Sequence, residues 1–227
     1  MTLKSDAEEI EQFMRGLTHE PWLGTRARYP LHLFRIDDVT AAVSILERGV
    51  IYSRNRAEAK GLLGHDSASP SVIEQSPDWC KECVRLYFRP KTPTEYRSEG
   101  FRPSANIRMG AHRPMPIVFV FDSIPLLVST GTIFTNGNAA TGGVKRGSTA
   151  AFLKSVPFEK VYHDGPIPEA DKRDIVFRRC AEVLLKNELT LDHLKHVFCR
   201  SQAEYDTLMD LLSDESRTKY SKMIGVS

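Results

Sequence analysis

The chain has 227 residues, of which 41% are hydrophobic and 26% charged, with a formal net charge of +2. This composition excludes an intrinsically disordered chain, and a length below roughly 250–300 residues predicts a single compact domain. The longest apolar stretch, residues 116–128, is interrupted by Asp122 and Pro125 and falls short of the ~20 apolar residues of a membrane helix. The acidic, amphipathic N-terminus does not resemble a secretory signal. We therefore expect a cytoplasmic, monomeric protein.

The first quarter of the chain predicts a helix followed by a strand, helix, strand unit. Apolar residues recur at helical spacing over residues 6–17. Residues 30–36 alternate as a strand, and Asp37 is placed as the N-cap of the next helix. Gly49 is placed to end that helix before a strand at residues 50–52.

Long polar segments separate the strands predicted for the middle of the chain. Residues 54–82 predict a long loop with one helical turn at 70–75, and loops of this length inside a compact domain are usually functional. Residues 83–88 predict a strand, and residues 97–113 a basic loop. Residues 117–121 are the most apolar strand, which indicates a central position covered on both faces.

The last part of the chain predicts a strand at 131–137, a helix at 168–185, a strand at 195–199 and a helix capped by Ser201. The glycine-rich segment 142–149 imitates a phosphate-binding loop but lacks the lysine after its last glycine, so we reject that interpretation. The elements together predict an α+β domain with a strongly bent central sheet of about six or seven strands and flanking helices.

The four cysteines, at positions 80, 83, 180 and 199, are too few for a disulfide scaffold, so reduced thiols are expected. Cys80 and Cys83 have the spacing of half a zinc site, but the sequence contains no second Cys-x-x-Cys. We therefore expect no metal.

Four segments carry a resemblance to a known family. They are LHLFRIDD at 31–38 with the helix behind it, YFRPKTPTEY at 87–96, IFTNGN at 133–138 and RRCAEVL at 178–184. In this order and spacing they resemble the DarT family of DNA ADP-ribosyltransferases. The likeness covers roughly residues 30–212 and leaves out the first helix.

The resemblance implies a fold, a co-substrate and a catalytic residue. We expect a helical extension over residues 1–29 and a DarT-like domain with the ADP-ribosyltransferase fold over residues 30–227. NAD⁺ is the implied co-substrate, and breaking its bond between nicotinamide and ribose passes through an oxocarbenium-like state. That state requires a held cofactor and a carboxylate near the developing cation. The resemblance gives this role to Glu182, which would otherwise be interpreted as a carboxylate on the surface of the predicted helix 168–185.

Cofactor contacts follow from the same segments, although strand histidines and aromatic residues are core residues in most proteins. The family carries an arginine before its aromatic strand, but residues 71–76 contain none. Arg54, Arg56 and Arg85 are the candidates to replace it, because a guanidinium reaches a phosphate from several backbone positions. The predicted cofactor-binding residues are His32, Leu33, Phe34, Arg54, Asn55, Tyr87 and Phe88.

Basic residues cluster in the second and last thirds of the chain, among aromatic residues such as Phe152, Phe158 and Tyr162. This pattern suits a single-stranded nucleic acid, whose phosphates need cations and whose bases stack on rings, although a solvated charged surface gives the same pattern. The predicted nucleic-acid contacts are Arg89, Lys91, Lys145, Arg146, Arg173 and Arg178.

The leading hypothesis is an NAD-dependent mono-ADP-ribosyltransferase that modifies a base in single-stranded DNA. The resemblance also implies a toxin of a toxin-antitoxin or phage-defence system, with a macrodomain antitoxin as partner. Three alternatives remain: an RNA acceptor, a protein acceptor, and a catalytically silent module that binds single strands, which the missing arginine suggests.

Overall fold

The computed structural model describes residues 2–63, 69–107 and 110–226. The strands are β1 (His32–Asp38), β2 (Val50–Tyr52), β3 (Cys83–Tyr87), β4 (Pro116–Asp122), β5 (Ile133–Thr135), β6 (Arg146–Gly147), β7 (Glu182–Lys186), β8 (Glu188–Thr190), β9 (Leu194–Cys199) and β10 (Ile224–Val226). The helices are α1 (Ala7–Leu17), α2 (Val39–Arg48), α3 (Arg54–Ala59), α4 (Pro70–Gln75), α5 (Asp78–Lys81), α6 (Pro93–Ser98), α7 (Ser123–Leu127), α8 (Ala150–Lys154), α9 (Phe158–Val161), α10 (Lys172–Arg178), α11 (Gln202–Leu211) and α12 (Asp214–Tyr220). Short 3₁₀ helices occupy Pro21–Arg26, Tyr29–Leu31, Ser104–Asn106, Glu169–Asp171 and Leu191–His193.

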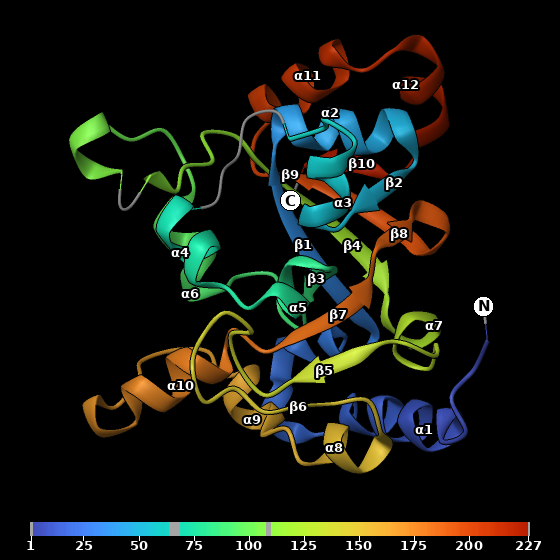
Figure 1. Ribbon diagram of the computed structural model, residues 1–227, viewed down its shortest axis with the longest axis vertical. Coiled ribbons are helices and arrows are strands. Elements are labelled where there is room, and N and C mark those ends of the chain that lie inside the picture. Colours follow the sequence, from blue (N-terminus) through green and yellow to red (C-terminus); the bar gives the residue numbers. More distant parts are fainter. Residues whose placement is uncertain (1, 64–68, 108–109, 227) are drawn as a thin grey trace.

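An eight-stranded sheet with the order β10-β9-β4-β1-β3-β7-β5-β6 forms the centre of the molecule, and β2 and β8 pair separately. Helices α2, α11 and α12 lie towards one end of this sheet, and α1, α8 and α9 lie towards the other (Figure 1). The predicted α+β class is confirmed, with eight strands in the sheet where about six or seven were expected. Within the described residues, no helix has the length and apolar character needed to cross a membrane.

The sheet is forked at the boundary between β1 and β3. Strand β1 pairs with β4 along its whole length, from His32 opposite Asp122 to Asp38 opposite Pro116. It pairs with β3 only where Phe34 faces Tyr87. One half of the sheet, β10-β9-β4-β1, therefore meets the other half, β3-β7-β5-β6, at a single residue pair, and the two halves diverge from there.

Helix α2 begins and ends for local reasons. The Asp38 side chain accepts a hydrogen bond from the Thr40 backbone N–H at 3.3 Å, and Gly49 adopts the left-handed conformation that ends the helix. The predicted N-cap, Asp37, is wrong by one residue because β1 continues through Asp38 and the Asp37 carboxylate instead binds Arg35 at 2.7 Å.

The prediction of one helix over residues 168–185 is wrong. Helix α10 ends at Arg178, and β7 begins at Glu182 and pairs with β3 over five residues. Residues 183–185 are Val, Leu and Leu, and so short an apolar run suits a buried strand as well as a helix. The segment is a strand because its backbone pairs with β3 on one side and with β5 on the other. The predicted loop 54–82 also contains α3 and α5 besides the expected helical turn α4.

Helix α1 packs onto the rest of the protein. Ile10 and Met14 have no exposed surface and belong to the same core as Leu33, Phe121 and Val183. The helix contacts α7 and α8, which flank the lower end of the sheet in Figure 1. The N-terminal extension is thus an integral layer of the fold.

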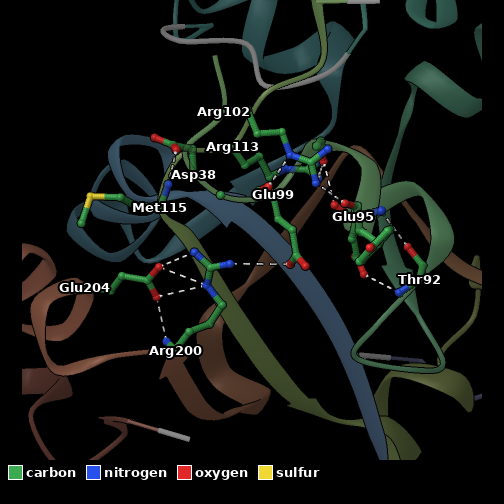
Figure 2. Close-up of polar contacts among 12 residues, drawn as sticks. Asp38, Thr92, Glu95, Glu99, Arg102, Arg113, Met115, Arg200 and Glu204 are labelled. Atoms are coloured by element: carbon green, nitrogen blue, oxygen red, sulfur yellow. Dashed lines mark hydrogen bonds and ion pairs between the residues drawn. The ribbon is translucent and has the colours of Figure 1, made fainter. Parts of the chain in front are cut away.

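A network of charged residues joins α6, the segment before β4 and α11 (Figure 2). Thr92 and Glu95 form a capping box at the start of α6, and the Arg113 guanidinium donates to the Ser98 hydroxyl at 2.8 Å. The Arg200 guanidinium binds Glu204 at 2.5 Å. Arg200 also lies 4.0 Å from the carboxylate of Glu99, the residue that follows α6, so Arg113 and Arg200 both contact this end of the helix.

The buried carboxyl of Glu95 makes a pH-dependent contribution to stability. Glu95 is 3% exposed, and burial raises its pKa from 4.5 to about 7, although the Thr92 backbone hydrogen bond and the charge of Arg113 oppose the shift. Because the folded-state pKa is raised, the stability that the protonated carboxyl contributes is complete below about pH 4.5 and is lost as the pH rises through 7.

We expect Glu95→Gln to be more stable than the wild type at pH 8, by up to about 3 kcal/mol, because the amide carries no charge to desolvate. The advantage should shrink towards zero at pH 4.5. Urea unfolding of both proteins at the two pH values measures it, with the exposed Glu169→Gln as control. An equal difference at both pH values would contradict the argument.

Candidate active site

Glu182 lies at the junction of the two halves of the sheet. It is the first residue of β7 and pairs with Tyr87 at the end of β3, which in turn faces Phe34 of β1. Paired residues on neighbouring strands present their side chains on the same face. The structure therefore brings together three predicted site residues, Glu182, Tyr87 and Phe34, as a row across three adjacent strands.

The Glu182 carboxylate is completely buried and fully hydrogen-bonded. Its Oε2 accepts from Arg85 Nε at 2.5 Å, and its Oε1 accepts from Arg85 Nη2 at 2.7 Å and from the Ala139 backbone N–H at 2.9 Å. A bidentate guanidinium is the strongest single partner that a buried carboxylate can have. Burial opposes the charge of Arg85, but the Glu182 carboxylate beside it raises the pKa of Arg85 above its ordinary value, so the guanidinium stays charged.

The turn after β5 supports this pair. The Thr135 hydroxyl accepts from the Glu182 backbone N–H at 2.9 Å and donates to the Gly137 carbonyl at 2.7 Å. The Asn138 side-chain oxygen accepts from Arg85 Nη2 at 3.3 Å and from the Ala140 N–H at 3.0 Å. The segment 133–138, singled out in the sequence, thus holds the backbone of Glu182 and one edge of Arg85.

Tyr87 is a neutral hydroxyl beside the ion pair. Burial is the largest cause that raises its pKa, and the negative charge of Glu182 adds to it. The phenol therefore remains protonated at every physiological pH and can donate a hydrogen bond.

A cavity of about 360 Å³ opens where β1 and β3 diverge. Residues from β1, α2, β2, α3, α4, α5 and β3 line it, and Tyr52, Ile45 and Ile73 contribute to an apolar part of the wall. Its volume lies in the range of small-molecule sites, roughly 300–1,000 Å³. Six of its lining residues are basic and one, Asp37, is acidic; the basic ones are Arg35, Arg48, Arg54, Lys81, Arg85 and Arg113.

This charge distribution suits an anionic ligand such as a dinucleotide. Among the described residues that line the cavity, Arg85 is the one hydrogen-bonded to Glu182, whose side chain has no exposed surface. Within the described parts of the chain, no group of three or more His, Cys, Asp or Glu residues is arranged to hold a metal, and the four cysteines are free thiols.

The other predicted cofactor residues occupy three different places. Arg54 lines the cavity, and Asn55 is exposed next to it on α3. Leu33 and Phe88 are fully buried in the hydrophobic core, so any contact they make with a cofactor would come from their backbone. His32 begins β1 opposite Asp122, and burial lowers its pKa, which keeps the imidazole neutral.

Two predicted nucleic-acid contacts, Arg89 and Arg178, bind groups within the protein. Arg89 is 6% exposed, and its guanidinium donates to the carbonyls of Val161 at 3.1 Å and His163 at 2.7 Å. Arg178 is bound to Asp174 at 3.0 Å and to the Asn136 carbonyl at 3.1 Å. The charge of Arg89 is thus buried and bound to carbonyl oxygens, which differs from the exposed position that the sequence analysis expected of a phosphate contact.

The remaining four basic candidates are exposed. Lys91 lies before α6 and Arg173 on α10, whereas Lys145 and Arg146 lie next to the turn that holds Glu182. The Lys145 backbone exchanges hydrogen bonds with Asn136, and the Arg146 guanidinium lies over the Trp79 ring at 4.1 Å. Two of the four, Lys145 and Arg146, therefore lie on the side of the site formed by β5, β6 and α5.

Sequence reasoning did not assign roles to Thr135 or Asn138 individually, and it left Arg85 as one of three candidates. Nothing in the sequence marks these positions, because their partners lie far along the chain: Arg85 and Glu182 are 97 residues apart and Thr135 and Glu182 are 47 apart. The alternation of β3 gave a partial signal, since it places Arg85 and Tyr87 on one face.

We expect Thr135→Val to destabilise the protein by about 1–3 kcal/mol, because it leaves the buried Glu182 N–H and the Gly137 carbonyl without their shared hydroxyl. Urea unfolding measures the loss. Thr135→Ser, which keeps the hydroxyl, is the control and should recover most of the stability. A valine variant as stable as the wild type would show that the hydroxyl has no such role.

Comparison with known proteins gives the family of the chain. Residues 34–223 match the family described as "ssDNA thymidine ADP-ribosyltransferase, DarT". No curated protein matches the chain.

Solved structures show the same fold. Thermus sp. 2.9 DarT in complex with NAD+ is 12% identical with a TM-score of 0.64, and the match covers 87% of this chain and 96% of that chain. The complex of the same protein with ADP-ribosylated ssDNA gives 14% and 0.63, with 87% and 94% covered. Thermosipho africanus DarTG in complex with ADP-ribose gives 16% and 0.65, with 82% of this chain and 48% of that chain covered. Because the family match extends over most of the sequence and the fold agrees, this chain belongs to the DarT family.

Proposed function

We propose that the protein is an NAD-dependent mono-ADP-ribosyltransferase that modifies thymidine in single-stranded DNA. The observation that carries the proposal is the buried Glu182 carboxylate, bound by Arg85 at the edge of a cavity with six basic lining residues. Membership of a family described by this reaction supports the substrate. The Thermus relative was solved with NAD+ and with ADP-ribosylated ssDNA, which supports the same pair of ligands here.

The residues suit the chemistry of the transfer. The basic residues of the cavity supply positive charge for the diphosphate of NAD⁺. Its apolar wall, which includes the Tyr52 ring, offers a surface for one of the two heterocyclic rings of NAD⁺. As the bond to nicotinamide breaks, positive charge develops on the ribose, and the Glu182 carboxylate stabilises it. Glu182 then accepts the proton that the acceptor base loses. Hydrogen bonds from Arg85 and from the Ala139 N–H hold this carboxylate in place, so little reorganisation is needed during the step.

The acceptor strand is proposed to lie over β6 and α5. Arg146 on β6 pairs with Thr135 on β5, and the Thr135 hydroxyl accepts a hydrogen bond from the Glu182 backbone N–H. One residue pair therefore links the exposed Arg146 to the strand that carries the carboxylate. Lys145 and Arg146 are exposed and can contact phosphates, with Lys91 and Arg173 as further contacts. Trp79 offers a ring beside Arg146.

Similarity to the Thermosipho DarTG protein supports a role as the toxin of a toxin-antitoxin pair. We propose a macrodomain antitoxin as the partner that removes the modification.

Glu182→Gln should lower transfer to single-stranded oligonucleotides by a factor of about 10²–10⁴, because it removes the general base and the charge opposite the developing cation. Mass spectrometry of thymidine-containing oligonucleotides incubated with NAD⁺ measures the gain of one ADP-ribose. Glu159→Gln, an exposed change of the same type on α9, is the control and should retain full activity.

Different outcomes select different functions. Modified RNA with unmodified DNA would favour the RNA acceptor, and nicotinamide release that needs added protein would favour a protein acceptor. Binding of oligonucleotides without nicotinamide release from the wild type would reject the enzyme in favour of a silent binding module.

The paired substitution of Lys145 and Arg146 by Gln should weaken single-stranded DNA binding and reduce the steepness of its salt dependence. Loss of two phosphate contacts lowers the slope of log Kd against log salt by about 1.4. Fluorescence anisotropy of a labelled oligonucleotide, measured from about 50 to about 200 mM salt, gives the slope for each protein. Lys219→Gln with Lys222→Gln, an exposed pair at the α12 end of the molecule, is the matched control, and an equal effect there would refute a local site.

A further inference from the structure

We propose that the rings of Tyr96 and Phe101 form a stacking surface for nucleotides that flank the acceptor thymidine in single-stranded DNA. The start of the basic loop predicted over residues 97–113 takes no part in the candidate active site, and this surface gives it a role. The inference rests on the proposed function for the identity of the polymer. Binding is measured without NAD⁺, so catalysis does not enter the result.

Both rings lie open to solvent. Phe101 is 78% exposed and Tyr96 is 73% exposed, the two highest values among the large hydrophobic residues of the described chain. By contrast, Phe88 and Phe134 have no exposed surface. Single exposed apolar residues are common on protein surfaces, whereas a group of them marks an interaction site. Two exposed rings on one short segment form such a group.

One braced turn of the chain carries both rings. The Arg102 guanidinium donates to the Tyr96 carbonyl at 2.7 Å and to the Glu99 carbonyl at 3.0 Å, which closes the chain between the two aromatic residues. The Gly100 N–H donates to the Arg113 carbonyl at 2.8 Å and fixes this turn to the segment before β4. Because the backbone that carries the rings is held in place, little freedom is lost when a ligand binds.

The exposed charges around the rings are positive. Lys91 and Arg97 are exposed and have no carboxylate partner among the described residues. The two acidic residues of the segment are engaged, since Glu95 is buried in its capping box and Glu99 lies 4.0 Å from Arg200. Cations beside rings suit a single-stranded nucleic acid, whose phosphates need positive charge and whose bases stack. This charge favours a nucleic acid over a purely apolar partner.

The surface begins next to the proposed catalytic residue. The Thr94 hydroxyl at the start of α6 lies 3.7 Å from the Cys180 thiol, and Cys180 precedes Glu182 by two residues. Tyr96 follows on the same helix, and Phe101 follows its end, where the chain projects away from the sheet (Figure 1). A strand whose acceptor base reaches Glu182 can therefore place on the rings only the nucleotides that lie to one side of that base.

The experiment is fluorescence anisotropy with labelled single-stranded DNA that contains one thymidine. The oligonucleotides are about 4 nucleotides long, or extended to about 16 on the 5′ side or on the 3′ side. We expect Tyr96→Ala with Phe101→Ala to bind one of the two extended oligonucleotides about tenfold or more weakly than the wild type does, because stacking on each ring is lost. Leu211→Ala is the matched control and should bind like the wild type, since Leu211 is 52% exposed on α11.

Two further readouts distinguish stacking from other contributions. The slope of log Kd against log salt should not change in the double alanine variant, because rings neutralise no phosphate, whereas Arg97→Gln should lower it by about 0.7. Tyr96→Phe with Phe101→Tyr keeps both rings and should retain the affinity. Tyr96→Leu with Phe101→Leu keeps apolar side chains without rings and should not.

Equal affinity of the double alanine variant and the wild type for both extended oligonucleotides would overturn the surface and leave a protein as its occupant. A loss of the same size on the short oligonucleotide would also overturn it, because the rings would then contact the acceptor nucleotide. A wild type that shows the expected ring dependence but modifies no oligonucleotide would overturn the proposed function and leave the surface in place. Modification of thymidine without ring dependence would overturn the surface alone.

Discussion

The burial of one carboxylate constrains the centre of this fold. Glu182 is a charged group with no exposed surface, and an uncompensated charge in that position would cost several kcal/mol. Arg85 balances this charge, and the Ala139 N–H donates a further hydrogen bond to it. Both contacts depend on the positions of β3 and of the turn after β5 relative to β7. The pair therefore couples three strands of the sheet to one chemical group, and that group is the one suited to stabilise a cation.

The fork of the sheet gives this group access to a ligand. Strands β1 and β3 share a single residue pair, Phe34 with Tyr87, and the space that opens beyond it is the arginine-lined cavity. A continuous ladder between the two strands would close that space with main-chain hydrogen bonds. The same junction carries Glu182, so the point where pairing stops is also the point where the cavity and the ion pair come closest through Arg85.

The basic residues divide into two groups with different physical roles. Arg89 and Arg178 donate hydrogen bonds to backbone carbonyl oxygens. Arg113 likewise donates to a group within the protein, the Ser98 hydroxyl (Figure 2). Lys145 and Arg146 remain exposed beside the turn that supports Glu182. Sequence clustering does not separate these groups, because a guanidinium beside a carbonyl and one beside solvent have the same local composition.

The sequence by itself determined the elements whose signals are local. Capping and the left-handed glycine set α2 to within one residue, β3 and β4 followed from apolar runs, and the order of four short segments identified the family. The tertiary structure alone decided that Glu182 begins a strand and that Arg85 is its partner. It also decided that Arg89 is buried. The reason is that strand pairing and ion pairing join residues as far as 97 positions apart, and no pattern within a short window contains that information.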